Sequence, residues 1–155
     1  DILSKGCFLI SREVYQKMIE QNNGGSIIFV SSKNSLSASK GASAYSVAKS
    51  SLLHLSRLIA LEGSAYKIRS NVVNPDAVIQ GSKIWKGDWK KQRAISNKIS
   101  INNVEEFYKN RSLLKESILP EDIAEGIYFF ASSKSKKSTG NIINVDGGNI
   151  TSFTR

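Results

Sequence analysis

The chain has 155 residues, of which 40% are hydrophobic and 23% are charged. These proportions are typical of a globular protein, and the length suits one domain with its own hydrophobic core. Apolar runs fall far short of the roughly 20 residues that cross a bilayer, so we expect no membrane association. The one cysteine, Cys7, excludes an internal disulfide and fits a cytoplasmic protein. With one histidine besides that cysteine, a zinc site is disfavoured, and we expect no metal.

The net charge is +9, which raises the question of an anionic partner. Basic residues are spread along the whole length, and the two densest groups lie in the polar stretches 83–93 and 134–137. An even spread is typical of a solvated, lysine-rich surface, whereas nucleic-acid binders concentrate their charge on one face. We therefore expect no nucleic-acid partner, while an anionic ligand such as a dinucleotide would use part of this charge.

The first part of the chain predicts a helix, a strand and a second helix. Apolar residues in 4–21 recur at helical spacing, and the Asn and Gly residues at 22–25 end that helix. Residues 26–30 are apolar at consecutive positions, as in a strand buried on both faces. A second helix is predicted over 42–62, and its apolar arc is wide enough for burial against both a sheet and a partner subunit.

Two more strands and a third helix complete the predicted order. Residues 69–75 form a strand closed by Pro75, and Pro120 opens a helix that leads to a last strand at 141–145. Alternating helices and strands favour an α/β fold, in which a parallel sheet carries helices on both faces in three Rossmann-like layers.

The segment 76–119 differs in kind from the rest of the chain. It is polar, contains Trp85 and Trp89, and shows helical periodicity only near 104–114. An excursion of this length in a compact domain is usually a lid or a binding loop, and we expect a lid here.

Three polar side chains fall where ligands bind in such sheets, at the carboxyl ends of the strands. Ser32 follows the first strand, and Tyr45 begins the next helix with Lys49 four residues later on the same face. A nearby ammonium lowers the pKa of a phenol, so Tyr45 could exchange a proton with an alcohol or carbonyl. Ser32 could hold the same substrate oxygen. This trio suits hydride transfer to or from a nicotinamide.

Five segments read G-G-S-I-I-F-V-S-S, Y-S-V-A-K, I-R-S-N-V-V-N-P, L-P-E-D-I-A-E-G-I and T-G-N-I-I-N-V-D-G-G. With them the whole chain resembles the C-terminal part of the short-chain dehydrogenase/reductase family. The resemblance implies that Ser32, Tyr45 and Lys49 are catalytic. It also implies a cofactor, NAD or NADP, that contacts Tyr45, Lys49, Pro75 and Val78.

A narrower group is similar in N-P-D-A-V-I-Q-G-S-K-I-W, R-S-L-L-K, G-N-I-I-N-V-D-G-G-N and the final F-T-R. This group is the dehydrogenase half of bifunctional rhamnulose-1-phosphate aldolase/alcohol dehydrogenases, which serve rhamnose metabolism. In those proteins an aldolase domain that produces lactaldehyde precedes the dehydrogenase. The resemblance therefore implies an alcohol dehydrogenase whose substrate is lactaldehyde or a similar short hydroxyaldehyde or alcohol.

The family resemblance also implies homo-oligomers formed through the helices at 4–21 and 42–62. An alternative interpretation starts from the same helices. The chain would then be a non-catalytic oligomerisation module of a larger bifunctional aldolase/dehydrogenase.

The chain departs from the family pattern in three ways. Asp76 follows Pro75 where the family has glycine, and residues 3–5 contain no asparagine where a fourth catalytic residue is often found. No G-x-x-x-G-x-G or G-x-G-x-x-G occurs, although such a turn holds the pyrophosphate of a dinucleotide. We therefore expect residues 1–155 to be the C-terminal catalytic half of a dehydrogenase domain, inactive alone, with an open edge on its first strand.

Overall fold

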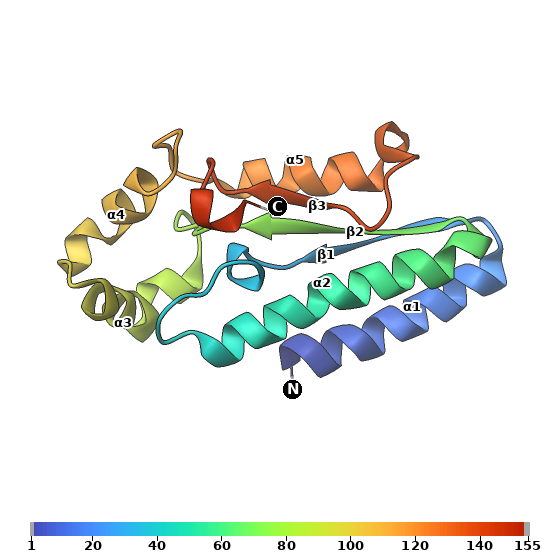
Figure 1. The fold of residues 1–155 in the computed structure, drawn as a ribbon, viewed down its shortest axis with the longest axis horizontal. Helices are drawn as coiled ribbons and strands as arrows, with labels where there is room; N and C mark the ends of the chain where they lie inside the picture. Colours follow the sequence, from blue (N-terminus) through green and yellow to red (C-terminus); the bar gives the residue numbers. More distant parts are fainter. Residues whose placement is uncertain (1, 154–155) are drawn as a thin grey trace.

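A three-stranded parallel sheet lies between two layers of helices (Figure 1). The computed structural model describes residues 2–153, so the last two residues of the F-T-R end lie outside the described part. The strands, in their order across the sheet, are β1 (Gly25–Val30), β2 (Ile68–Pro75) and β3 (Ile142–Val145). One face carries α1 (Cys7–Gln21) and α2 (Ser43–Gly63), and the other carries α5 (Pro120–Ala131). The predicted α/β, Rossmann-like layering is confirmed.

The pairing of the strands shows which of them is central. Phe29 of β1 lies opposite Val72 of β2, and Val73 of β2 lies opposite Ile143 of β3. Strand β2 is therefore covered on both edges and both faces, which explains its run of buried residues. Within residues 2–153, β1 pairs with β2 alone, so its other edge is open, as expected.

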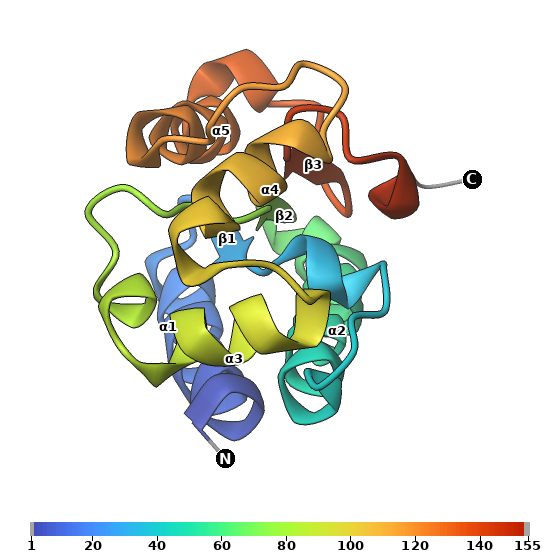
Figure 2. The ribbon, with the colours of Figure 1, turned by 90° about the vertical axis from the view of Figure 1, so that its left-hand side faces the viewer.

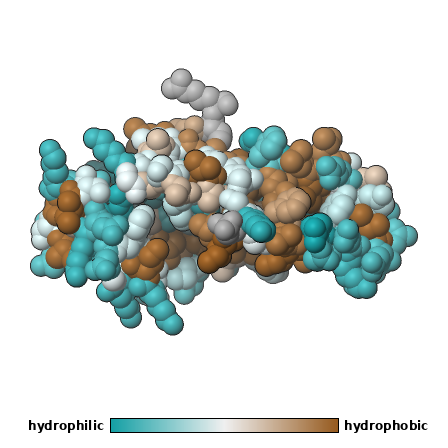
Figure 3. Space-filling model, turned by 90° about the horizontal axis from the view of Figure 1, so that it is seen from below, coloured by the Kyte–Doolittle hydropathy of each residue, from teal (hydrophilic) through white to brown (hydrophobic). Residues whose placement is uncertain are grey.

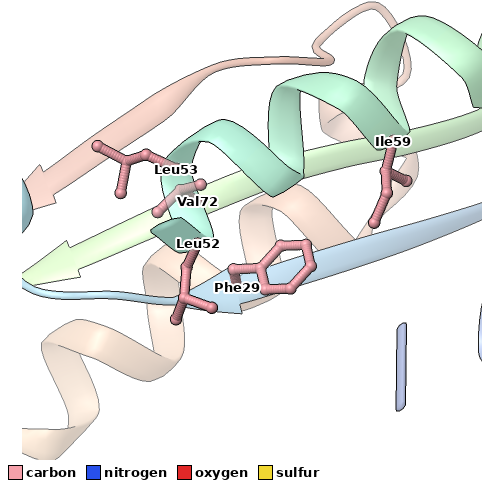
Figure 4. Close-up of a cluster of buried hydrophobic side chains, with 5 residues drawn as sticks. All are labelled: Phe29, Leu52, Leu53, Ile59 and Val72. Atoms are coloured by element: carbon pink, nitrogen blue, oxygen red, sulfur yellow. The ribbon is translucent and has the colours of Figure 1, made fainter. Parts of the chain in front are cut away.

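The main apolar cluster lies where α2 packs on the sheet (Figure 4). Its buried members come from α2, β1 and β2, and none is more than 7% exposed: Phe29, Leu52, Leu53, Ile59 and Val72. Burial of a leucine, isoleucine or phenylalanine side chain stabilises a fold by about 1.5–3 kcal/mol. The cluster therefore holds α2, and with it the residues at its N-terminus, in a fixed position over β1 and β2.

The first helix differs from the prediction at its start. A π-helical turn, Ile2–Gly6, precedes α1, whereas the sequence pattern predicted one helix from residue 4. Ser4 in this turn is held against α2, because it accepts a hydrogen bond from Ser51 at 2.9 Å and donates one to the Ala48 carbonyl at 3.5 Å. The other end agrees with the prediction, since Asn22 adopts a left-handed conformation (φ 52°) and caps α1.

The segment 76–119 contains two helices that cap the carboxyl ends of the strands (Figure 2). They are α3 (Asp88–Asn97), which the sequence pattern did not predict, and α4 (Val104–Asn110), which ends before the predicted residue 114. Helix α3 is mostly polar and buries only Arg93 and Ala94, so its apolar periodicity is weak. Tertiary contacts rather than an apolar stripe therefore hold this helix in place.

Candidate active site

Ser32 lies just after β1, where the chain turns towards α2. Its backbone is extended, and its Oγ accepts a hydrogen bond from the Asn34 backbone N–H at 3.2 Å, which caps a short 3-10 helix. The neighbouring Ser31 is buried, and its hydroxyl donates to the Lys49 carbonyl at 2.8 Å. Of the two serines, Ser31 thus has a structural role, and Ser32 remains free to face a ligand.

Tyr45 and Lys49 occupy the first two turns of α2, on one side of the helix. The Lys49 ammonium lies 5.9 Å from the centroid of the Tyr45 ring and donates a hydrogen bond to the Val30 carbonyl at 2.9 Å. Burial lowers the pKa of Lys49 from its ordinary value. The positive charge of Lys49 is therefore held between the end of β1 and the phenol.

A cleft of about 230 Å³ opens at the carboxyl ends of β1 and β2. Ser32 and Tyr45 line it together with Val78, which follows β2, and with Trp85 and Trp89 of the lid. The structure thus brings together residues that are far apart in the sequence. Two other predicted site residues, Lys49 and Pro75, are not among those lining this cleft.

Asp76, which stands where the family has glycine, anchors the lid. It is 8% exposed and forms an ion pair with Arg111, whose Nε lies 3.2 Å from Oδ2 and whose Nη2 contacts Oδ1. The Asn149 side chain donates to the same carboxylate at 3.0 Å. Asp76 therefore joins the end of β2, the segment after α4 and the C-terminal segment.

Aromatic rings and guanidinium groups alternate along the lid wall of the cleft. The Trp85 and Tyr108 rings are 5.1 Å apart, and the Arg111 guanidinium lies 4.1 Å from the Tyr108 centroid. Arg93 lies 5.0 Å from the centroid of Trp89 in the same way. Both tryptophans thus line the cleft, and these contacts join parts of the lid to one another.

Three charged or aromatic residues that line this cleft were missed by sequence reasoning: Arg93, Tyr108 and Arg111. The one signal that could have found them was the density of basic and aromatic residues within an insertion at the ligand-binding edge. That signal does not distinguish a side chain that turns inward from one that turns to solvent.

Within 2–153, no three His, Cys, Asp or Glu side chains come together as ligands of a metal ion would. None of the helices in that range combines the length and the apolar character needed to cross a bilayer.

Comparison with known proteins gives consistent matches. A family model described as Enoyl-(Acyl carrier protein) reductase matches residues 1–149. The protein named Uncharacterized oxidoreductase YuxG from Bacillus subtilis is 52% identical over the entire chain, which covers 22% of that protein. D-erythrulose reductase from Gallus gallus is 32% identical over 98% of the chain, which covers 57% of that protein.

A solved structure gives the same result for the fold. Sorbitol-6-phosphate 2-dehydrogenase SrlD from Erwinia amylovora superposes with a TM-score of 0.86 at 31% identity, over 92% of this chain and 55% of that one. The chain thus covers little more than half of the length of two of these relatives and 22% of the length of the Bacillus subtilis protein. The family match over residues 1–149, together with the parallel sheet and its helical layers, shows that the chain belongs to the short-chain dehydrogenase/reductase family.

Proposed function

We propose that residues 1–155 are the C-terminal catalytic half of an NAD(P)-dependent alcohol dehydrogenase, with a lid at 76–119. The observation that carries this proposal is the shared cleft, in which Ser32 and Tyr45 face the lid at the carboxyl edge of the sheet. The coverage of its relatives supports the view that a longer protein supplies the glycine-rich half.

Tyr45 is the proposed acid/base. In alcohol oxidation its phenolate accepts the hydroxyl proton of the substrate while a hydride leaves the carbon that bears this hydroxyl group. In reduction the phenol returns the proton to the carbonyl oxygen. Ser32 donates a hydrogen bond to the reacting oxygen and holds it beside Tyr45. The Lys49 ammonium, 5.9 Å from the centroid of the Tyr45 ring, places a positive charge beside the proposed proton-transfer site.

A nicotinamide cofactor, when bound, supplies the acceptor or donor of the hydride. Tyr45, Lys49, Pro75 and Val78 are the residues proposed to hold it. Val78 lines the same cleft as Tyr45, and Pro75 ends the adjacent strand β2, so both lie at the edge of the sheet at which Tyr45 lies. The proposal leaves NAD and NADP as alternatives, because the ribose-reading residue of the family belongs to the other half.

The proposed substrate is a short hydroxyaldehyde or alcohol of the lactaldehyde type. A cleft of about 230 Å³ with hydroxyl and indole groups suits a molecule of a few carbons with several oxygens. Relatives named for erythrulose and sorbitol 6-phosphate support polyol-like chemistry. The low coverage of the Bacillus subtilis relative supports a much larger parent, as the resemblance to bifunctional aldolase/dehydrogenases implies.

The test is Tyr45→Phe in the full-length protein that carries this chain, with lactaldehyde and each cofactor. We expect kcat to fall at least about 100-fold, which is the usual scale of general acid–base catalysis. Tyr66→Phe, in the 3-10 turn that follows α2, is the control and should retain the wild-type rate, because Tyr66 is exposed and does not line the cleft. If Tyr45→Phe keeps kcat within about threefold of wild type, the acid/base assignment is wrong.

A second candidate function, oligomerisation, is favoured by the exposed face of α1 and α2. Figure 3 shows apolar residues gathered on the side of the molecule that these helices form. On α2 they include Val47, Leu58 and Leu61, which are 71%, 42% and 73% exposed and recur on one helical face. An area of this character commonly pairs with a partner, and the proposed partner is a second copy of the chain.

Sedimentation of the full-length protein tests this surface. Leu61→Glu should convert an oligomer into monomers, because it buries a charge in the proposed interface. Ile95→Glu is the matched control, since Ile95 is 76% exposed but lies on α3. A wild-type protein that stays monomeric at high concentration would exclude the surface as an interface.

A further inference from the structure

A second cavity adjoins the proposed active-site cleft. Its volume is about 420 Å³, and it shares Ser39, Arg93, Tyr108 and Arg111 with the cleft. Four cationic residues line it: Lys33, Lys40, Arg93 and Arg111. Among the described residues that line this second cavity there is no carboxylate, and the other polar groups are hydroxyls and amides. This composition suits an anion rather than a neutral molecule.

Arg93 is the first group that lacks a sufficient partner. It is 6% exposed, and its Nη2 donates to the Lys40 carbonyl at 2.7 Å. Its Nε is buried and has no hydrogen-bond partner among the described residues. A buried charged donor without an acceptor costs considerable free energy, so its persistence beside a cavity points to an acceptor that arrives with a ligand.

Lys33 is the second such group, and it also is 6% exposed. Its hydrogen bond to Ser39 is long, at 3.4 Å. The nearby carboxylates are already engaged by other groups. Asp76 pairs with Arg111 and Asn149, while Asp146 accepts from the Ser152 hydroxyl and from a backbone N–H. Burial, followed by the charge of Arg111, lowers the pKa of Lys33, as expected for an ammonium without its own counter-ion.

We propose that this cavity, lined by Lys33, Arg93 and Arg111, binds an oxyanion at the end of the substrate remote from the reacting carbon. The substrate class is therefore a short hydroxy-carbonyl compound that, unlike lactaldehyde itself, carries a terminal phosphate or carboxylate. This inference rests on the proposed function, because it assigns the far end of the molecule whose near end lies at Ser32 and Tyr45. The proposed cofactor residues do not line this cavity, so the two ligands would bind in separate places.

The kinetic test compares three aldehydes in the full-length protein: D-glyceraldehyde 3-phosphate, succinic semialdehyde and uncharged glyceraldehyde. We expect kcat/KM for at least one charged aldehyde to exceed that for glyceraldehyde by about tenfold or more. The preferred charged substrate identifies the phosphate or the carboxylate as the natural group. Arg93→Lys and Lys33→Gln should each reduce the preference at least about fivefold, whereas Lys86→Gln, on the exposed outer part of the lid, should not.

A binding measurement separates this inference from the proposed function. Titration with inorganic phosphate should shift the Nε–Hε NMR signal of Arg93, identified by its loss in Arg93→Lys. A protein that oxidises or reduces aldehydes without a preference for charged ones, and whose Arg93 signal does not move with phosphate, overturns the inference alone. A shifted signal in a protein that turns over none of the aldehydes supports the anion site and contradicts the proposed function.

Discussion

The Lys49 ammonium donates a hydrogen bond at 2.9 Å to the carbonyl oxygen of Val30, the last residue of β1. The Lys49 carbonyl in turn accepts from the Ser31 hydroxyl at 2.8 Å. One residue of α2 is thus bound at both ends to the segment that leads into Ser32. The contact that places a positive charge near Tyr45 is also the contact that holds the serine turn against the helix.

Lys49→Met should therefore reduce both stability and activity. Loss of a charge-assisted hydrogen bond costs about 1 kcal/mol. Burial of the ammonium, which lowers the pKa of Lys49, offsets part of this, so the free energy of unfolding should fall by less than about 1 kcal/mol. The turnover number should fall further than this loss of stability explains, because Tyr45 loses the nearby charge. Urea unfolding and kcat of the full-length protein measure the two effects. Lys5→Met, at an exposed position, is the control. A variant with wild-type kcat would show that the ammonium serves only the fold.

Asp76→Asn should loosen the lid. The change keeps the size of the side chain but removes its charge, which leaves Arg111, 24% exposed, without its counter-ion. We expect a loss of about 2 kcal/mol in urea unfolding, below the range for fully buried pairs. Asp88→Asn breaks the ion pair with Lys91, in which the aspartate is 83% exposed, and should cost less than about 1 kcal/mol. Equal losses in the two variants would contradict the anchoring role of Asp76.

Two glycines with the same backbone conformation should differ in their tolerance of alanine. Gly147 (φ +63°) has no room for a side chain, because an added Cβ would lie 2.9 Å from the Ser112 Oγ. Gly81 (φ +71°) has no heavy atom within 4 Å of the same position. Gly81→Ala should therefore cost only the left-handed strain of about 1 kcal/mol, and Gly147→Ala should cost roughly twice as much. Urea unfolding measures the difference, and a lower cost at Gly147 would contradict the close contact with Ser112.

The sequence predicted those parts of the fold that local patterns determine. The apolar stripe of α2 and the consecutive apolar residues of the strands reflect burial in two clusters, one on each face of the sheet, so the order of the elements and their parallel pairing could be inferred. Helix α3 could not be predicted, because long-range contacts hold it, such as Arg93 to the Lys40 carbonyl. Sequence reasoning had no access to those contacts.

The candidate site likewise contains residues that the sequence could identify and residues that it could not. Ser32, Tyr45 and Lys49 were identified because they follow one strand and begin one helix, which fixes their relative positions locally. Arg93 and Arg111 enter the site from the lid, and their positions depend on the ion pair with Asp76 and on contacts with aromatic rings. A residue of this kind cannot be told from a surface arginine until the lid is packed.

The pH dependence of stability provides a last prediction, on Lys33. Burial and then the charge of Arg111 lower the pKa of this lysine below its ordinary 10.5, against the opposing effects of Asp76 and Asp146, and Arg93 lowers it further. Between the lowered pKa and 10.5, the unfolded chain binds more protons than the folded one. The contribution of Lys33 is therefore a penalty at lower pH that disappears as the pH rises through this window.

Lys33→Met removes that titration and should reveal it by difference. The variant should gain stability relative to wild type at about pH 7, and the gain should shrink as the pH approaches about 10. Comparison at equal pH cancels the opposite effect of Tyr108, whose pKa is raised by burial. Lys83→Met, at an exposed lysine of the lid, is the control for the loss of one surface charge. Because the wild-type penalty comes from an ammonium without its own counter-ion, saturating phosphate should reduce it, and the variant should then lose its advantage even at about pH 7. A difference between Lys33→Met and wild type that grows with pH would mean that the fold stabilises the charged form of Lys33.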